Sequence, residues 1–353
     1  MDKSDREYLR KEQRSPRGYI GGRMPAPLSP RTTRSPVPFV HIVNPGLQTT
    51  VQDEGRWGLQ SHGVPVAGPM DPWSHRIANA LVRNDRNQAV LEVAFVGPEV
   101  EFEDERLVAV AGAEFVMSLD GAAVEPNVSF VAGAGSRLRF GTRVRGSRAY
   151  LAIAGGVAVP PVMGSRATHL VSRLGGLEGR ALAAGDRVPL GDAQKRSGRF
   201  FAALSKTYPT PVLGPHAHLR LLPGPQRDYL SPDALDLLQS APYSIGRQSD
   251  RMGFRLEGPR LRHVRGADII SDATPLGALQ VPASGQPVLL MADRQTTGGY
   301  PKIATLITAD IGVAGQLGPG DTISFSMCTP RDAFAALIAQ ERALMALEAS
   351  AAS

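Results

Sequence analysis

The residues best suited to chemistry lie in a polar insert between two strongly apolar segments. Residues 288–292 read VLLMA and residues 303–308 read IATLIT, and the ten residues between them include two cations, a carboxylate, an amide and two threonine hydroxyls. A hairpin loop needs only roughly two to five residues, so the insert is longer than a simple turn requires. The sequence therefore predicts either a ligand-binding loop or a solvated hairpin with an exposed Arg–Asp pair.

The insert and a neighbouring strand supply groups that could bind a small anion carrying an amide. Arg294 presents a planar fork of donors and Lys302 a point charge, both suited to a carboxylate or a phosphate. Tyr300 could donate a hydrogen bond, and Gln280 has the donor and acceptor that read an amide, unless it simply faces solvent on its strand. We expect these four residues to be the catalytic set.

The rest of the insert is expected to contact the substrate. Its two adjacent glycines allow the backbone to approach a ligand closely, and backbone N–H groups in such a turn can form a concave anion site. The expected contacts are Asp293, Gln295, Thr296, Thr297, Gly298 and Gly299.

A second polar cluster surrounds Arg251. Asp250 stands between Arg247 and Arg251, just before a short apolar run. One interpretation is a buried charge pair in which Asp250 orients Arg251 toward an anionic ligand. The alternative is an exposed salt bridge at a turn.

A third candidate is the Gly- and Pro-rich loop of residues 63–71, which ends in Met70 and Asp71. It leads into a predicted helix, and a helix N-terminus favours anions. Met70 and Asp71 are therefore candidate substrate contacts. The alternative is that Asp71 only caps the helix.

Signatures of several other chemistries are missing from the sequence. No Gly-rich loop ends in Gly-Lys-Ser or Gly-Lys-Thr, no helical pattern pairs histidines for zinc, and no Gly-x-Ser-x-Gly elbow occurs. His216 and His218 alternate on one face of a strand, but no third ligand is near, so we expect no metal site. The single cysteine, Cys328, excludes an internal disulfide and fits a reducing cytoplasm.

The charge of the chain is concentrated in its N-terminal segment. The formal net charge is +6, yet residues 1–38 alone hold nine Lys or Arg and four Asp or Glu. The remainder is close to neutral, so we expect no nucleic-acid partner. No apolar stretch is long enough to span a bilayer, and we expect no membrane contact. Residues 1–38 are rich in Arg, Ser and Pro, which predicts a disordered basic tail.

From residue 39 onward, short apolar and β-branched runs alternate with glycine and proline. This spacing predicts many short strands and therefore a mainly β protein of sandwich or barrel type. The runs are Leu91–Val96, Val108–Ala111, Val128–Val131, Leu138–Phe140, Ala149–Ala154, Leu219–Leu222, Val288–Ala292, Ile303–Thr308 and Thr322–Phe325. Segments 97–102 and 182–188 are echoed in the same order by 258–263 and 317–323, which indicates two related domains. We place them at 39–200 and 201–330, with the junction in the polar segment 191–211.

Few helices are expected. Asp71-Pro72 combines an N-cap residue with proline at the first helical position and predicts a helix that ends near Asn84. Ser231-Pro232-Asp233 predicts a second short helix that runs through Leu238. The alanine-rich amphipathic pattern within residues 331–353 predicts a C-terminal helix.

Several long motifs in a fixed order resemble one protein family. The motifs are Thr49–Asp53, Gly63–Pro65, Met70-Asp71, Ala78-Asn79, Leu91–Val93, Arg148–Gly156, Gly164–Thr168, Gly175–Arg180, Leu222–Gln226, Ser249–Gly253 and Ala292–Ala304. From about residue 43 to residue 325, the chain resembles the family formed by the C-type subunit of 5-oxoprolinase and by allophanate hydrolase subunit 2. This family is biotin-dependent carboxyltransferase-like and includes proteins of the kinase-inhibitor antagonist type. Glu114 and Asp272 stand where the family is expected to carry Asp and Glu, which keeps both charges.

The resemblance implies two cyclophilin-like β-barrel domains and a hydrolase that acts on a cyclic amide within a complex. It implies a B-type, kinase-inhibitor-like subunit and an A-type subunit as partners, and a reaction in which the complex uses ATP to open 5-oxo-L-proline to L-glutamate. The chain has no ATP-grasp-like region and no biotinyl-lysine segment. ATP would therefore be used by the complex, and any biotin would reside on a separate protein.

Within this function, the candidate residues take implied roles. Arg294 and Lys302 would hold the substrate carboxylate or the transferred anion, and Gln280 and Tyr300 would orient the amide. Asp293 or Asp250 would orient an arginine. Two other functions fit the same resemblance: a carboxyltransferase component acting on urea or a related amide, and a non-catalytic regulatory partner of the B-type subunit.

Overall fold

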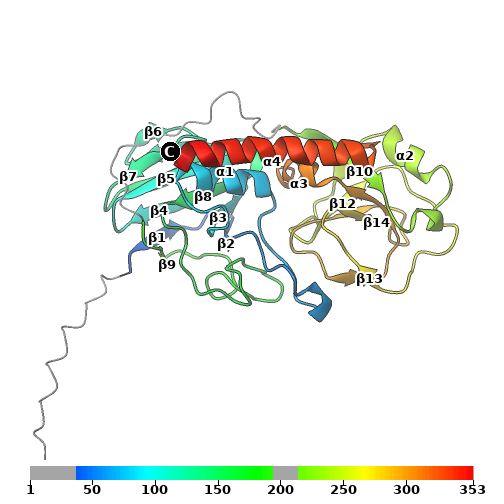
Figure 1. The fold of residues 1–353 in the computed structure, drawn as a ribbon, viewed down its shortest axis with the longest axis horizontal. Helices are drawn as coiled ribbons and strands as arrows, with labels where there is room; N and C mark the ends of the chain where they lie inside the picture. Colours follow the sequence, from blue (N-terminus) through cyan, green and yellow to red (C-terminus); the bar gives the residue numbers. More distant parts are fainter. Residues whose placement is uncertain (1–36, 194–213, 353) are drawn as a thin grey trace, which may run out of the picture. The chain divides into compact units, whose positions relative to one another are not determined.

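The computed structural model describes residues 37–193 and 214–352, and within these ranges the protein is mainly β (Figure 1). The fold class predicted from the sequence is therefore confirmed. The predicted tail, up to residue 36, and most of the predicted junction at 191–211 lie outside the described residues.

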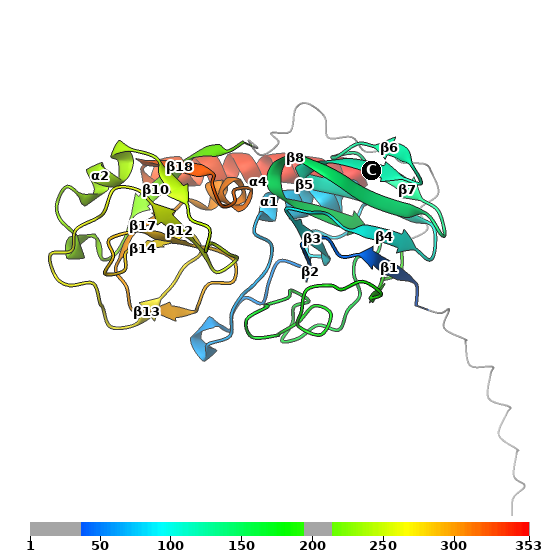
Figure 2. The same cartoon turned by 180° about the vertical axis from the view of Figure 1, so that it is seen from behind.

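Nine strands from the first half of the chain form one curled sheet, which makes a half-barrel (Figure 2). The strands are β1 (Phe39–Asn44), β2 (Gln48–Gln52), β3 (Val90–Ala94), β4 (Glu99–Phe102), β5 (Arg106–Leu119), β6 (Ala122–Val124), β7 (Phe130–Ala132), β8 (Arg137–Ile153) and β9 (Arg187–Pro189). The hydrogen-bonded path runs β2-β3-β8-β4-β1-β9, and β5 pairs with β6, β7 and β8.

Strand β8 differs from the sequence prediction. The runs Leu138–Phe140 and Ala149–Ala154 were expected to be two strands, but almost all of both belongs to one strand of 17 residues. Of the residues between them, 141–145 are all exposed and 146–148 are buried, and the pairing with β5 shifts register three times nearby. A segment that is exposed on both faces loses the apolar alternation that marks a strand, so the sequence reads as two strands.

Seven strands from the second half close into a barrel. They are β10 (His216–Pro223), β11 (Tyr243–Ile245), β12 (Gly253–Glu257), β14 (Ala278–Gln280), β15 (Val288–Leu290), β17 (Lys302–Leu306) and β18 (Thr322–Met327). The barrel closes through a parallel pair, β10 with β18. Apolar side chains from these strands, including Leu219, Phe254, Leu279 and Ile303, form its core.

The polar insert is a crossover connection rather than a hairpin. Strands β15 and β17 both pair antiparallel with β14, which lies between them, so they run parallel to each other. A connection between parallel strands must travel back along the strands, which accounts for the length of the insert. Part of it, β16 (Thr297–Gly298), pairs with β13 (Asp272–Ala273). The two ends of the insert therefore lie near opposite ends of β14.

The helices lie largely where the sequence predicted them. The α-helices are α1 (Pro72–Leu81), α2 (Ala234–Ser240), α3 (Ile311–Gly315) and α4 (Pro330–Ala352), and the 3-10 helices are η2 (Gln60–His62), η3 (Arg227–Tyr229) and η4 (Thr308–Asp310). Helix α1 begins after its predicted N-cap, Asp71, but ends at Leu81, earlier than expected. Helix α3 was not predicted, because five residues carry too little periodicity to be recognised.

Helix α4 packs along α1 (Figure 1). Leu344 joins Trp73 in a hydrophobic cluster beneath the two helices. Arg76 of α1 donates to Glu341 and Glu348 of α4 at 2.8 and 2.9 Å. Among the helices of residues 37–193 and 214–352, none combines the length and the apolar character that a membrane span requires.

Candidate functional site

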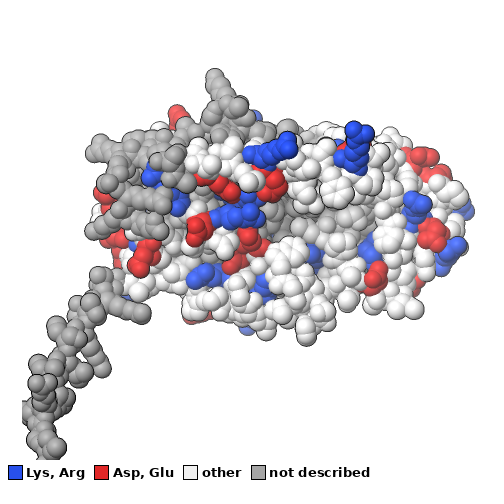
Figure 3. Space-filling model, viewed as in Figure 1, with Lys and Arg blue, Asp and Glu red and all other residues white. Residues whose placement is uncertain are grey.

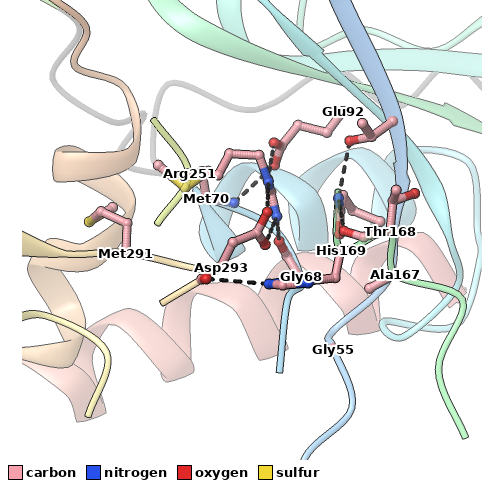
Figure 4. A network of polar contacts seen from close by, with 12 residues as sticks. Gly55, Gly68, Met70, Glu92, Ala167, Thr168, His169, Arg251, Met291 and Asp293 are labelled. Carbon is pink, nitrogen blue, oxygen red and sulfur yellow. Dashed lines mark hydrogen bonds and ion pairs between the residues drawn. The ribbon is translucent and has the colours of Figure 1, made fainter. Parts of the chain in front are cut away.

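A buried arginine, Arg251, connects the barrel to the curled sheet (Figure 4). Arg251 lies just before β12 and is only 5% exposed. Its Nε and Nη2 donate to the two oxygens of Asp293 at 2.9 and 2.8 Å, and its Nη1 pairs with Glu92 of β3. Burial alone would lower the pKa of Arg251, but the carboxylates of Asp293 and Glu92 raise it. The positive charge of Arg251 is thus countered by two carboxylates inside the protein.

The network continues from Glu92 into the curled sheet. Glu92 Oε2 accepts from the Met70 backbone N–H at 2.9 Å and from the Tyr150 hydroxyl at 2.8 Å. The Tyr150 oxygen in turn accepts from the Asp71 N–H at 2.7 Å. Burial raises the pKa of Tyr150 well above its ordinary value, so Tyr150 keeps the proton that it donates.

The N-terminus of α1 is occupied by the chain's own carboxylate. Asp71 accepts from the Ser74 N–H at 3.0 Å, the Ser74 hydroxyl at 2.5 Å and Gln316 Nε2 at 2.7 Å. Met70 and Asp71 are both fully buried. The capping alternative therefore describes Asp71, and the structure gives no support to an anion site at this helix end.

A second arginine, Arg294, lines a cavity of about 390 Å³ formed by α1, α3, α4 and the start of the insert. Arg294 is 7% exposed; its Nε donates to the Thr274 carbonyl at 2.8 Å. Among the described residues, no carboxylate lies within ion-pair distance of its guanidinium. Burial lowers the pKa of Arg294 to about 10. Because this pKa is still well above 7, Arg294 remains a cation at neutral pH. We call this space the Arg294 cavity.

The other charged groups around the Arg294 cavity are already paired. Arg76 is held by glutamates of α4, and Arg86 lies 3.2 Å from Glu54. Figure 3 likewise shows basic and acidic side chains interspersed on the face that it presents, without a broad field of one sign. Arg294 therefore offers the cavity a cation without an ion-pair partner in the part of the chain that the structure describes, since the neighbouring Asp293 is bound by Arg251.

His75 of α1 also lines the Arg294 cavity. It is fully buried, its two ring nitrogens are closed off from solvent, and the polar group that contacts the ring is the backbone of Gln52. Its ring stands edge-on to Tyr150, with centroids 6.1 Å apart. Burial lowers the pKa of His75, although Glu54, Asp53 and Glu92 oppose this, so the ring is neutral near pH 7.

A second cavity, of about 370 Å³, borders Arg251 and Asp293 on the other side of the network. The second cation that lines this cavity is Arg148, which donates to the carbonyls of Gly315 and Leu317 at 2.8 and 3.2 Å. The Arg148 guanidinium also lies against two phenylalanine rings. These contacts assign Arg148 a structural role at the junction between the sheet and the barrel.

A third group of predicted residues gathers at the far end of the insert. Lys302 is buried, and its Nζ lies 2.9 Å from Asp272 Oδ2. Hydrogen bonding to Lys302 lowers the pKa of Asp272. Gln280 Oε1 accepts from Gln295 Nε2 at 3.2 Å, while Gln280 Nε2 is buried without a partner among the described residues. A Cβ at Gly298 would lie 2.4 Å from that same Nε2, so the buried Gln280 side chain would have to shift to admit one.

The other predicted residues are more exposed. Asp250 accepts from the Met252 N–H at 2.8 Å in a local turn, and its place beside Arg251 is taken by Asp293. Tyr300 is 40% exposed. Thr296 and Gly299 accept backbone hydrogen bonds from Thr274 and Ile269, and Thr297 lies in β16. The predicted set therefore divides among the Arg251 network, the Arg294 cavity and the Lys302 end of the insert.

Sequence reasoning missed Glu92, Tyr150 and His75. A signal for Glu92 was available, because it is the one charged residue in the strand VLEVA, whose residues are all buried. A carboxylate at such a position requires a buried partner. His75 gave no comparable signal, since its cavity depends on helix α4, which is more than 250 residues away in the sequence.

The structure gives no sign of a metal centre or a polyphosphate cradle within residues 37–193 and 214–352. No group of three or more His, Cys, Asp or Glu residues there could hold a metal ion. His216 and His218 bond instead to Thr322 and Ser326 at 2.8 Å. The N-terminus of α1 is capped by Asp71, and the Gly298-Gly299 turn leads into no helix, so neither provides the free helix N-terminus that binds the phosphates of a nucleoside triphosphate. No ATP-dependent step is assigned to this chain.

Comparisons with known proteins give the architecture a family. Residues 62–327 match the family described as carboxyltransferase domain, subdomain A and B. The chain belongs to this carboxyltransferase family. It is also 39% identical over 304 residues to the C-type subunit of 5-oxoprolinase from Escherichia coli (strain K12), an alignment that covers 86% of this chain and 96% of that protein. Helix α4 begins beyond the end of the family match.

Two solved structures share the fold of this carboxyltransferase-family chain. The Kluyveromyces lactis urea carboxylase has a TM-score of 0.81 at 28% identity, over 89% of this chain and 30% of that chain. The protein TTHA0988 has a TM-score of 0.73 at 37% identity, over 87% of this chain and 60% of that chain. The chain therefore spans less than two thirds of either protein, although it spans nearly all of the Escherichia coli 5-oxoprolinase relative.

Proposed function

We propose that the chain is the C-type subunit of an ATP-dependent 5-oxoprolinase complex, which opens 5-oxo-L-proline to L-glutamate. The observation that carries this proposal is the 39% identity to the C-type subunit of the Escherichia coli 5-oxoprolinase across nearly the whole length of that protein. An A-type and a B-type subunit are the proposed partners, and ATP is proposed to be used by the complex rather than by this chain. A cytoplasmic location follows from the same proposal.

The Arg294 cavity supports this function through its chemistry. The proposed substrate is a small five-membered lactam that carries a carboxylate. Arg294 supplies a buried guanidinium without a counter-charge among the described residues, and a carboxylate would form charge-assisted hydrogen bonds to it. Apolar side chains of α1 and α4, including Trp73 and Leu344, line part of the cavity, and a less polar surrounding strengthens such an interaction.

The Lys302 end of the insert is proposed to hold the amide side or the transferred anion. Thr274 binds Arg294 and Asp272 binds Lys302. Thr274 and Asp272 lie two residues apart, so one short segment of chain contacts both ends of the insert. Gln280 and Tyr300 keep their proposed role of orienting the amide.

The other predicted residues are proposed to act indirectly. Arg251 and Asp293 form a rigid pair directly before Arg294, and we propose that they fix the position of Arg294. Gln295, Thr296, Thr297, Gly298 and Gly299 shape the backbone of the insert, and Asp250 holds the turn that precedes β12.

Co-expression with the A-type and B-type subunits tests the proposal. The assay measures glutamate released from 5-oxo-L-proline with and without ATP, together with assembly of the complex by size-exclusion chromatography. We expect ATP-dependent turnover that R294A abolishes while assembly persists. The Arg139 side chain on β8 is 72% exposed. R139A is therefore the matched control, and it should keep full activity. Full activity of R294A would remove Arg294 from the reaction.

The likeness to urea carboxylase favours one alternative, a carboxyltransferase component acting on urea or a related amide. In that case biotin on a separate protein would supply the carboxyl group. Inhibition of the complex by avidin would support this alternative, and avidin-insensitive turnover of 5-oxo-L-proline would exclude it. Binding to the B-type subunit without turnover of either substrate would instead indicate a regulatory partner.

A further inference from the structure

We propose that Trp57 is a specificity-determining residue of the Arg294 cavity, where its indole packs against the flat ring of a small cyclic acid and so separates the cyclic substrate from its ring-opened product. The inference rests on the proposed function for the choice of 5-oxo-L-proline and L-glutamate as that pair. Trp57 lies outside the set of residues for which the sequence gave a role.

The first observation is that both tryptophans of the chain line the same cavity. The sequence contains two tryptophans, Trp57 and Trp73, and each borders the Arg294 cavity. Trp73 of α1 is 6% exposed and belongs to the hydrophobic cluster beneath α1 and α4, whereas Trp57 is 58% exposed. The ring of Trp57 is therefore accessible to a molecule that enters the cavity.

The second observation is that the polar end of Trp57 already has a partner. Its Nε1 donates to the Glu54 carbonyl at 2.8 Å. An indole carries one hydrogen-bond donor and no acceptor, so nothing polar is left for a ligand. What Trp57 offers the cavity is the apolar face of its ring, which suits a flat ring better than a charged group.

The third observation is that the chain around Trp57 is anchored. Arg56, the residue before it, is 2% exposed. Its Nη2 donates to the Ala167 carbonyl at 2.5 Å, and its backbone N–H donates to the Val66 carbonyl at 2.9 Å. An exposed ring on an anchored backbone loses less conformational freedom when it binds, which favours binding.

The fourth observation is that the loop carrying Trp57 lies beside the insert carrying Arg294. Arg56 precedes Trp57, and Asp293 precedes Arg294. Burial lowers the pKa of Arg56, and the nearby charges of Asp53 and Asp293 oppose this change. Because charge interactions weaken with distance, Arg56 and Asp293 must be close. A carboxylate bound to Arg294 therefore leaves the rest of a small ligand in the space that Trp57 borders.

The walls of the cavity distinguish the substrate from the product by charge as well as by shape. At neutral pH, 5-oxo-L-proline carries one charged group, its carboxylate, whereas L-glutamate carries two carboxylates and an ammonium and has no ring. Arg294 supplies one cation without an ion-pair partner among the described residues, and Trp57 and Leu337 are among the apolar residues beside it. Two further charges placed against such walls would lose water without gaining a partner. The cavity therefore favours the lactam and releases the opened acid.

The test measures binding of three acids to the full chain. 5-Oxo-L-proline carries the carboxylate and the ring, acetate keeps only the carboxylate, and L-glutamate is the opened product. Their affinities are measured by calorimetry for the wild type and for the variants W57A, W57F and F334A. Phe334 is 65% exposed on α4 and does not line the cavity, so F334A is the matched control for loss of an exposed aromatic ring.

We expect the wild type and F334A to prefer 5-oxo-L-proline over L-glutamate by roughly tenfold or more. W57A should weaken the binding of 5-oxo-L-proline by roughly threefold to tenfold, while acetate binds as before. W57F, which keeps an aromatic face, should restore most of the affinity. In the assembled complex, W57A should raise KM for 5-oxo-L-proline and leave kcat nearly unchanged, because packing on the ring is lost equally in the bound substrate and in the transition state.

A second measurement keeps the test valid if W57A packs poorly. In W73F, Trp57 is the one tryptophan left in the sequence, so its fluorescence reports on that ring alone. Its emission should change as 5-oxo-L-proline saturates the chain and should not change with acetate. The inference is overturned if W57A binds 5-oxo-L-proline as the wild type does, if W57A weakens acetate equally, or if the Trp57 emission does not respond to bound 5-oxo-L-proline.

The inference and the proposed function can fail separately. If the assembled complex turns over 5-oxo-L-proline and W57A changes neither KM nor the affinity of the chain, the inference alone is wrong. If the chain binds 5-oxo-L-proline in the way that depends on Trp57 but the complex, with ATP, releases no glutamate, the proposed function alone is wrong.

Discussion

Arg251 and Arg294 are two buried arginines on either side of Asp293, and they differ in how their charge is balanced. Their exposed fractions are nearly equal, at 5% and 7%. Arg251 has a bidentate contact with Asp293, a second carboxylate in Glu92 and the Gly68 carbonyl. Arg294 has backbone carbonyls and no ion pair among the described residues. Burial of an arginine therefore does not identify its role, but the presence or absence of a counter-charge does.

The difference has an energetic meaning. A buried charge without a partner is unfavourable, so a protein keeps one only where another molecule supplies the partner or where the cost is offset elsewhere. The Arg251 network satisfies its own charge and is expected to stabilise the junction between the sheet and the barrel. The Arg294 cavity leaves one charge unsatisfied, and that charge is available to a ligand.

The largest expected effect is on stability, when each arginine is replaced by methionine. R251M leaves Glu92 and Asp293 buried without their cation, and we expect a loss of about 3–5 kcal/mol in the free energy of unfolding. R294M removes an unpaired charge and should leave stability unchanged or slightly higher. Urea denaturation of both variants and the wild type measures the difference. Equal losses would show that the two arginines do not differ in the way that their contacts indicate.

The next effect is stabilisation by a ligand. At 100 times its dissociation constant, a ligand that binds only the folded chain stabilises it by about 2.7 kcal/mol. We expect 5-oxo-L-proline to stabilise the wild type and to lose this effect in R294M. R139M, on the exposed face of β8, should respond as the wild type does. A full response of R294M in thermal unfolding would place the ligand in another cavity.

A smaller effect is expected at the Lys302 end of the insert, where crowding rather than charge is tested. In G298A, the added methyl group would collide with Gln280 Nε2 in a buried site, and overpacking of this kind costs about 1–3 kcal/mol. In G299A, the nearest atom is 3.6 Å away, so no loss is expected. The free energies of unfolding of the two variants are compared. A loss in G299A that matches the loss in G298A would show that backbone freedom, not packing, requires these glycines.

The smallest effect concerns His75 and pH. Burial lowers the pKa of His75 in the folded chain below its ordinary value of 6.5, so the unfolded chain binds more protons below that pH. Stability is then fully present above pH 6.5 and is lost as the pH falls toward the lowered pKa, by at most about 1.4 kcal/mol per pH unit. Urea denaturation between pH 7.5 and pH 5 should show a shallower pH dependence for H75Q than for H62Q. Identical slopes would contradict a buried neutral His75.

Much of the fold could be predicted from the sequence, because its signals are local. Asp71-Pro72 marks the start of α1, and the apolar runs mark most strands of both sheets. The prediction failed where the signal was not local. Residues 141–145 of β8 are exposed on both faces, so they lack strand periodicity.

The candidate site was harder to predict than the fold. The insert was recognised by its composition, but a sequence cannot show that β14 lies between β15 and β17. That topology separates Arg294 from Lys302 and divides a set of residues that looked continuous. Asp250, the neighbour of Arg251, and Asp293 were both predicted as residues that orient an arginine. The structure brings Asp293 of the insert and Glu92 of β3 to Arg251, and Asp250 holds a local turn instead.

A crystal structure of the full chain with 5-oxo-L-proline tests the central claim most directly. The account predicts the substrate carboxylate at roughly 2.7–3.0 Å from the guanidinium of Arg294, with Arg251 still bound to Asp293 and Glu92. A ligand found in the cavity beside Arg148, or one that displaces Asp293 from Arg251, would contradict it.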